Sequence, residues 1–235
     1  MNIEIITFDA DDTLWYAQRD YEAAEAELVE ILAPWENPSG INQILLEIEK
    51  INIPFYGYGI KSFVLSMVEA AIKISNGEIQ TSAINQILRI GRSMKEQPII
   101  LRPHVAETIL MLTEQFPLML ITKGDLLDQH DKLNRSGLAD HFSLIEVVNE
   151  KTSEIYQEVF KKYRINCQSL LMVGNSLKSD ILPILELGGT TVHIPDENPW
   201  EHELVASFEP PEDGFHVLEH MGQLPELIDQ IHTAD

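Results

Sequence analysis

The sequence predicts an α/β fold: a parallel β-sheet whose first strand is followed by an inserted helical domain. Two observations predict it. Short apolar, β-branched stretches recur along the chain, and from residue 103 onward each alternates with an amphipathic helical stretch, which is the pattern of parallel strands joined by crossover helices. Between the first strand and this alternation, residues 18–97 show helical periodicity alone.

The strands are short, apolar and bounded by polar clusters. The first is "NIEIITF" at residues 2–8. Four more are predicted at 117–122, 142–148, 169–174 and 190–195. Helices are predicted between them, and "GFHVLEHMGQLPELIDQIH" is expected to add a short edge strand and a last helix.

Four helices are predicted within residues 18–97, where apolar residues recur at helical spacing. The first, "YEAAEAELVEILAPW", has a Glu-rich outer face, the third ends at Asn-Gly and the fourth stops near Pro98. "NIPFYGYGIKSF" at 52–63 is interpreted mainly as a connection between two helices. We therefore expect residues 1–17 and 98–235 to form the sheet domain and residues 18–97 to form a four-helix domain.

Composition restricts the possible partners. The chain has 235 residues and a formal net charge of −22, which should repel nucleic acid and anionic membrane surfaces. An anionic substrate would therefore need a local positive centre. A single cysteine excludes an internal disulfide, and neither a signal peptide nor an apolar run long enough to span a bilayer is visible. We expect a cytoplasmic protein; the sequence gives no indication of its oligomeric state.

Polar residues follow the predicted strands, at the edge where parallel strands place their ligands. "DADDT" follows the first strand, and Thr122 and Lys123 end the second. Lys151 lies just beyond the third strand, and "GNSLKSD" ends and follows the fourth. Carboxylates, a hydroxyl and an amine from four segments are thus expected to meet at one edge of the sheet.

This combination of groups suits phosphoryl transfer. Two neighbouring carboxylates, Asp9 and Asp180, need a cation, and Mg²⁺ takes one or two carboxylates together with waters and phosphate. One aspartate can attack phosphorus, and a second, Asp11, can protonate the leaving alcohol and then activate water. Thr122 and Lys151 would bind the equatorial phosphoryl oxygens.

The same motifs resemble the haloacid dehalogenase-like superfamily, in its phosphatase branch. "DADDT", "LMLIT", Lys151 and "GNSLKSD" match its four motifs in order, and the four-helix segment lies where the family's first class of cap domain is inserted. The resemblance implies a Rossmann-like core with a helical cap, and Mg²⁺ as cofactor.

The resemblance also implies a role for each matching residue. Asp9 would be nucleophile and metal ligand, and Asp11 would be general acid/base and give the metal a backbone carbonyl. Asp180 would bind the metal directly or through water. Thr122 and Lys151 would bind phosphate. Asn175 stands where an acidic residue is common, so we expect weaker Mg²⁺ binding there but a functional site. Lys123 is interpreted either as a further phosphate neighbour or as a lysine at the rim.

The predicted function is a Mg²⁺-dependent phosphatase that hydrolyses a small phosphorylated metabolite through phospho-Asp9. Nucleotide monophosphates, phosphoglycolate and sugar phosphates all fit as substrates. The alternatives are a phosphomutase, a 2-haloacid dehalogenase, a phosphonate-cleaving enzyme and a non-catalytic binding module. A dehalogenase has no use for Asp11. A phosphonate-cleaving enzyme would need a Schiff-base lysine in the cap, and nothing in the sequence marks Lys61 for that role.

Overall fold

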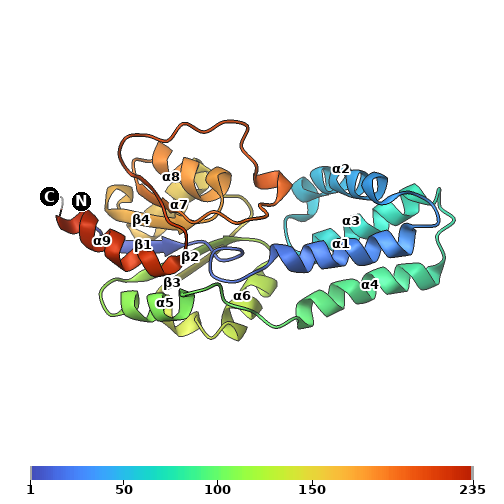
Figure 1. The fold of residues 1–235 in the computed structure, drawn as a ribbon, viewed down its shortest axis with the longest axis horizontal. Coiled ribbons are helices and arrows are strands. Elements are labelled where there is room, and N and C mark those ends of the chain that lie inside the picture. The colour runs from blue at the N-terminus through green and yellow to red at the C-terminus, as the bar shows by residue number, and fades with distance from the viewer. Residues whose placement is uncertain (1, 234–235) are drawn as a thin grey trace. The chain divides into compact units, whose positions relative to one another are not determined.

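The computed structural model describes residues 2–233, and the chain divides into two compact units (Figure 1). The core unit comprises residues 1–18, 99–123 and 131–235. The helical unit comprises residues 19–98 and, in addition, residues 124–130. The first half of helix α6 (Leu126–Arg135) therefore belongs with the helical unit, although it lies far from that unit's other residues in the sequence.

The core unit contains a six-stranded parallel sheet with the strand order β3-β2-β1-β4-β5-β6, which confirms the predicted α/β fold. The strands are β1 (Ile5–Phe8), β2 (Leu118–Lys123), β3 (Leu144–Val148), β4 (Leu170–Gly174), β5 (Thr190–His193) and β6 (Phe215–Val217). The order of the strands reverses at β1, which lies between β2 and β4. Such a reversal point is where open α/β sheets bind ligands.

Each face of the sheet packs against its own set of helices. Side chains alternate along a strand, so Ile6 and Phe8 join one apolar cluster while Ile5 joins the other. The first cluster includes residues of α5 (Val105–Thr113), α6 and α9 (Leu224–Thr233), and the second includes residues of α7 (Ser153–Tyr163) and α8 (Leu182–Glu186) (Figure 1). Because both faces are covered, the two central strands β1 and β4 are apolar except for Thr7.

The helical unit has its own apolar core. Its four inserted helices are α1 (Gln18–Leu32), α2 (Pro38–Tyr56), α3 (Ile60–Ile74) and α4 (Thr81–Glu96). Buried residues from all four helices meet in one cluster, among them Leu28, Leu45, Met67 and Ile87. The helices were predicted from this apolar periodicity.

The segment between α2 and α3 differs from the prediction. Helix α2 continues through Pro54 to Tyr56, so only Gly57, Tyr58 and Gly59 connect the two helices. Proline removes one backbone donor, but the helix resumes its hydrogen bonds beyond it, since Gly57 N donates to Ile53 O at 2.8 Å. The turn then needs positive φ angles, which the two glycines supply at 73° and 103°.

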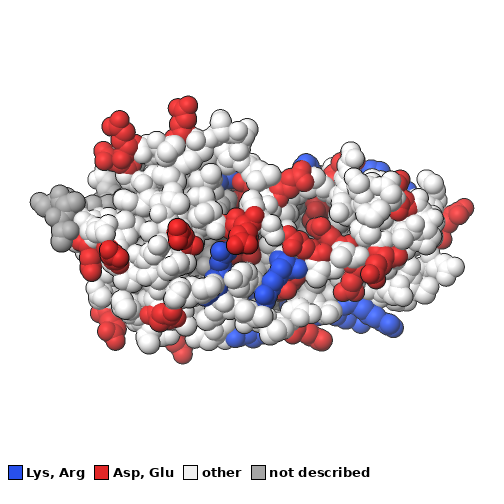
Figure 2. All heavy atoms as spheres, viewed as in Figure 1, with Lys and Arg blue, Asp and Glu red and all other residues white. Residues whose placement is uncertain are grey.

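None of the helices within residues 2–233 combines the length and the apolar character that crossing a bilayer would need. Acidic side chains are spread over the face shown in Figure 2, in keeping with the net charge of −22. Lys and Arg gather at fewer places on that face.

Candidate active site

The candidate site lies at the carboxyl ends of β1 and β4, beside the point where the strand order reverses. Asp9 directly follows β1, and its backbone N–H donates to Val173 O of β4 at 3.0 Å. Gly174 ends β4, and a Cβ atom placed there would come within 2.3 Å of the Asp180 carboxylate. Glycine therefore lets the Asp180 side chain pack directly against the strand end.

Lys151 holds two of the predicted carboxylates together. Its ammonium group donates to Asp9 Oδ1 at 2.6 Å and to Asp180 Oδ1 at 2.7 Å. The side chains of Lys151 and Asp180 are each 1% exposed and that of Asp9 is 9% exposed. Three groups from segments far apart in the sequence thus form one buried, hydrogen-bonded cluster.

Burial and mutual charge set the protonation of this cluster. Burial raises the pKa of Asp9 to about 7, and the charge on Asp180 adds to this, although Lys151 and Thr13 act in the opposite direction. For Lys151, burial favours the neutral amine, but the carboxylates of Asp180 and Asp9 raise its pKa well above the usual value. Lys151 therefore carries its charge, and a further cation at Asp9 would favour the carboxylate.

Short-range hydrogen bonds fix the two carboxylates. Thr13 Oγ1 lies 2.8 Å from Asp9 Oδ2 and 3.1 Å from Asn175 Oδ1. The hydroxyl has one proton, and the shorter contact to the charged oxygen receives it. Asp180 Oδ2 accepts from Ser176 N at 2.9 Å, within a π-helical turn at Leu177–Ile181. Thr13 therefore orients the Asp9 carboxylate.

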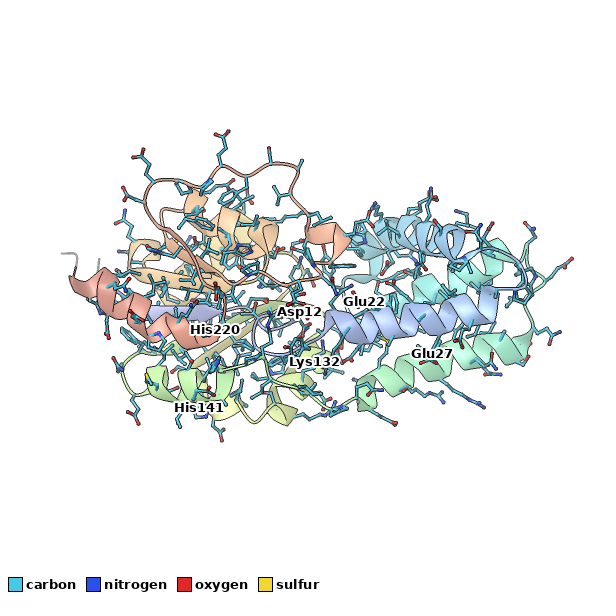
Figure 3. All side chains as sticks on the ribbon, in the orientation of Figure 1. Asp12, Glu22, Glu27, Lys132, His141 and His220 are labelled. Carbon is cyan, nitrogen blue, oxygen red and sulfur yellow. The ribbon has the colours of Figure 1, made fainter. Side chains whose placement is uncertain are left out.

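Asp11 is held by Trp15 and Lys132, and the sequence did not reveal either contact. Its carboxylate accepts from Trp15 Nε1 at 2.6 Å and from Lys132 Nζ at 2.9 and 3.1 Å. Lys132 lies on α6 (Figure 3), and its side chain is 11% exposed. Nothing in the local sequence distinguishes Lys132 from other lysines, because its contact with Asp11 depends on folding.

Asp12, labelled in Figure 3, has a structural role. Its φ is 60°, and its carboxylate accepts from the backbone N–H groups of Ala17 and Gln18, where α1 begins. Burial raises the pKa of Asp12 to about 7, against the effect of these hydrogen bonds. The third aspartate of the motif thus caps the start of a helix.

Thr122 and Lys123 end β2 and differ in how they are engaged. The Thr122 side chain is buried, and its hydroxyl makes a long contact of 3.4 Å with Lys123 O. The Lys123 ammonium donates to Ser179 Oγ at 2.9 Å and pairs with the Glu203 carboxylate. Phosphate binding by Lys123 stays a prediction, and Glu203 is a neighbour that the sequence did not indicate.

The donor set suits a hard cation, although Lys151 also binds two of its members. Among the residues that the structure describes, no group of three or more His, Cys, Asp and Glu side chains is placed to hold a metal ion. Magnesium needs fewer carboxylates, since it binds through one or two of them together with waters and substrate phosphate. Asp9, Asp180 and the Asn175 amide provide only hard oxygen ligands, so the residues present fit Mg²⁺.

Comparison with known proteins places the chain among hydrolases. The family model described as haloacid dehalogenase-like hydrolase matches residues 3–188. A glyceraldehyde 3-phosphate phosphatase from Methanocaldococcus jannaschii is 26% identical over 206 residues, which is 82% of this chain and 85% of the relative.

Two solved structures share the fold. A haloacid dehalogenase-like family hydrolase from Xanthomonas campestris has a TM-score of 0.88 and 32% identity, covering 99% of this chain and 93% of that one. The HAD-hydrolase YfnB from Bacillus subtilis, crystallised with magnesium, has a TM-score of 0.65 and 20% identity, covering 97% and 100%.

Proposed function

Since the chain belongs to the family of haloacid dehalogenase-like hydrolases, we propose that it is a phosphatase which hydrolyses a small phosphorylated metabolite through Asp9. The observation that carries the proposal is a second, separate acidic site beside the nucleophile. Asp11 is held by Trp15 and Lys132, whereas Asp9 is held by Lys151 and Thr13. Two aspartates that are positioned by different partners can take the two roles, nucleophile and proton donor, that phosphate ester hydrolysis requires.

The reaction proceeds in two displacements at phosphorus. Asp9 attacks phosphorus, the bond to the leaving oxygen breaks, and Asp11 gives its proton to that oxygen. Asp11 then takes a proton from water, the water oxygen attacks phosphorus, and the bond between Asp9 and phosphorus breaks to release phosphate. Thr122 and Lys151 bind the phosphoryl oxygens in both steps, where developing charge needs stabilisation.

Asp9 and Asp180 would hold Mg²⁺, with Asn175 and the backbone carbonyl of Asp11 as further oxygen ligands. When bound, the ion supplies positive charge that favours ionised Asp9 and offsets the charge of the phosphoryl group. A relative crystallised with magnesium supports this choice of cation. Lys151 then neutralises the remaining negative charge of the two carboxylates.

Two alternative chemistries of the same fold are less well supported. A dehalogenase releases halide, which needs no proton, and would leave the Asp11, Trp15 and Lys132 arrangement without a purpose. A Schiff-base lysine must be an uncharged amine when it attacks, but the Lys61 ammonium pairs with Asp125 at 2.8 Å within the helical unit. Its amine is therefore engaged by a carboxylate, which leaves Lys61 a poor candidate for phosphonate cleavage.

The substrate that we propose is a small sugar phosphate. The support is the likeness to a glyceraldehyde 3-phosphate phosphatase. The family match and the phosphatase activity of that relative also favour an enzyme over a binding module.

The test is phosphate release from a panel of phosphomonoesters, with Mg²⁺ and with EDTA. The proposal expects release that requires Mg²⁺ and disappears in Asp9→Asn. Asp12→Asn is the matched control, because it alters the same loop and keeps an oxygen that can cap the helix, so its activity should stay within a few-fold of the wild type. Wild-type protein that releases no phosphate from any ester, or Asp9→Asn protein with full activity, would contradict the proposal.

A further inference from the structure

Each of three lysines of the core unit, Lys151, Lys132 and Lys123, is paired with a carboxylate. Lys151 pairs with Asp9 and Asp180, and Lys132 pairs with Asp11. These partners are the carboxylates of the proposed reaction and its metal. The third lysine, Lys123, pairs instead with Glu203, which has no role in the mechanism above.

Glu203 lies in the segment between β5 and β6 and is held by three donors. Its carboxylate accepts from the Lys123 ammonium and from the hydroxyls of Ser176 and Ser179. The side chains of Lys123 and Glu203 are 14% and 13% exposed, so the pair is largely withdrawn from solvent. Burial opposes ionisation of the Glu203 carboxyl, but Lys123 and the two serine hydroxyls lower its pKa to about 2. The carboxylate is therefore charged whenever the protein is folded near neutral pH.

The rest of the segment is anchored as well, so Glu203 is not a chance contact of a loose loop. Lys178 Nζ donates to His202 O at 2.8 Å, and the His202 ring packs on Trp200 with 4.3 Å between ring centroids. Earlier in the segment, Asp196 pairs with Arg102. Two acidic side chains of this segment, Asp196 and Glu203, are therefore mostly buried against the core.

The Glu203 pair adjoins the candidate site directly. Lys123 follows Thr122, the predicted phosphate ligand, and Ser179 precedes Asp180. Lys123 Nζ lies 2.9 Å from Ser179 Oγ. The ammonium is thus close to two residues of the candidate site, since Lys123 is the neighbour of Thr122 in the sequence and Ser179 is the neighbour of Asp180. Removing the Glu203 charge would therefore make the region next to the phosphoryl site more positive.

We propose that Glu203 is a specificity-determining residue: by neutralising Lys123 it makes the enzyme select phosphomonoesters whose leaving group carries no second negative charge. This inference rests on the proposed phosphatase function and narrows its substrate class. A carboxylate or second phosphate on the leaving group would meet a lysine already compensated by Glu203, in a protein with a net charge of −22. An uncharged leaving group, such as a polyol or an aldehyde, meets no such penalty.

The test compares two substrates that differ by one carboxylate, glycerol 3-phosphate and 3-phosphoglycerate. The readout is the ratio of kcat/KM for 3-phosphoglycerate to kcat/KM for glycerol 3-phosphate. Glu203→Gln keeps an oxygen that can accept from the serines but removes one negative charge, so the ratio should rise about ten-fold, as expected for a change of one charge near the site. Glu201→Gln, an exposed residue of the same segment, is the matched control and should leave the ratio unchanged.

A second variant keeps the test decisive if Glu203→Gln does not fold. In Lys123→Gln the Glu203 charge is uncompensated, and the same ratio should fall below the wild-type value. In the double variant, where both charges are absent, the ratio should return toward that of the wild type. Comparing two substrates of the same protein sample removes any general loss of activity or stability.

The outcomes separate this inference from the proposed function. No phosphate release from either substrate by the wild type would refute the function itself. Phosphate release with an unchanged ratio in both single variants would refute the inference alone. An equal gain for both substrates in Glu203→Gln would also refute it, because it would place Lys123 on the phosphoryl group that the two substrates share.

Discussion

Replacing Lys151 with methionine should destabilise the core unit strongly, and Mg²⁺ should restore much of the loss. Methionine keeps the length of the side chain but removes the ammonium that lies 2.6 Å from Asp9 and 2.7 Å from Asp180. Removing one partner of a buried ion pair costs about 3–5 kcal/mol, because the remaining charge stays buried without compensation. Here two carboxylates lose their shared partner, so we expect a loss within that range.

The assay is urea unfolding, with and without Mg²⁺, followed by tryptophan fluorescence. The chain has three tryptophans, and Trp15 is fully buried in the core unit, where it contacts Asp11. Without the competing ammonium, Asp9 and Asp180 should bind Mg²⁺ more tightly in the variant than in the wild type. An ion that binds only the folded state adds more stability the more tightly it binds, so Mg²⁺ should stabilise the variant more. Lys161→Met, which removes an exposed lysine of α7, should cost no more than about 0.5 kcal/mol.

Two results would refute this reasoning. A loss below about 1 kcal/mol in Lys151→Met would mean that the two carboxylates do not depend on the ammonium, contrary to the cost of an uncompensated buried charge. Equal stabilisation of variant and wild type by Mg²⁺ would mean that the ion does not bind at these carboxylates.

Three further predictions test other parts of the structure. Burial, with a contribution from Glu25, raises the pKa of Glu49 in the helical unit from 4.5 to about 8. The folded state therefore favours protonated Glu49, and the stability that this provides is complete below about pH 4.5 and is lost as the pH rises toward 8. Glu49→Gln should gain about 3 kcal/mol over the wild type in urea unfolding at pH 7 and nothing at pH 4; a pH-independent difference would contradict this. Gly174→Ala should abolish Mg²⁺ binding in calorimetry while the protein stays folded, because the new Cβ would lie 2.3 Å from the Asp180 carboxylate and force it to move. Unchanged Mg²⁺ affinity would show that this packing is not required. Lys132→Gln should slow hydrolysis of alkyl phosphates about 10²-fold, because Asp11 would no longer be held in place to protonate the leaving group. Hydrolysis of p-nitrophenyl phosphate, whose leaving group needs little protonation, should stay within a few-fold of the wild-type rate. Equal losses for both substrates would exclude a role for Lys132 in positioning the proton donor.

One pattern in the sequence predicts both the fold and the clustering of the candidate site residues. Alternating strand and helix patterns imply a parallel sheet, and a parallel sheet brings the segments after its strands to one edge. Asp9, Lys151 and Asp180 follow three different strands, and they are in hydrogen-bond contact in the structure. Local side-chain caps are also readable, as shown by Asp125, which accepts from Asp128 N at 3.1 Å at the start of α6.

The remaining features depend on contacts that no local pattern encodes. Lys132 and Glu203 look like ordinary surface residues in the sequence, and their partners lie 121 and 80 positions away. The segment 124–130 groups with the helical unit because of tertiary contacts, which periodicity does not report. Helix α2 passes Pro54 because its later backbone groups still find partners, against the expectation that proline and the glycines beyond it end the helix earlier.

The central claim is that Asp9 carries the phosphoryl group during turnover, and trapping that group tests it most directly. The protein would be mixed with Mg²⁺ and glyceraldehyde 3-phosphate, quenched in acid within one turnover, digested and examined by peptide mass spectrometry. We predict one added phosphoryl group on Asp9 in the peptide that contains residues 7–15, and none in Asp9→Asn protein. Phosphate released at full rate with no phosphorylated Asp9 at any quench time, or a phosphoryl group on another residue, would contradict the mechanism.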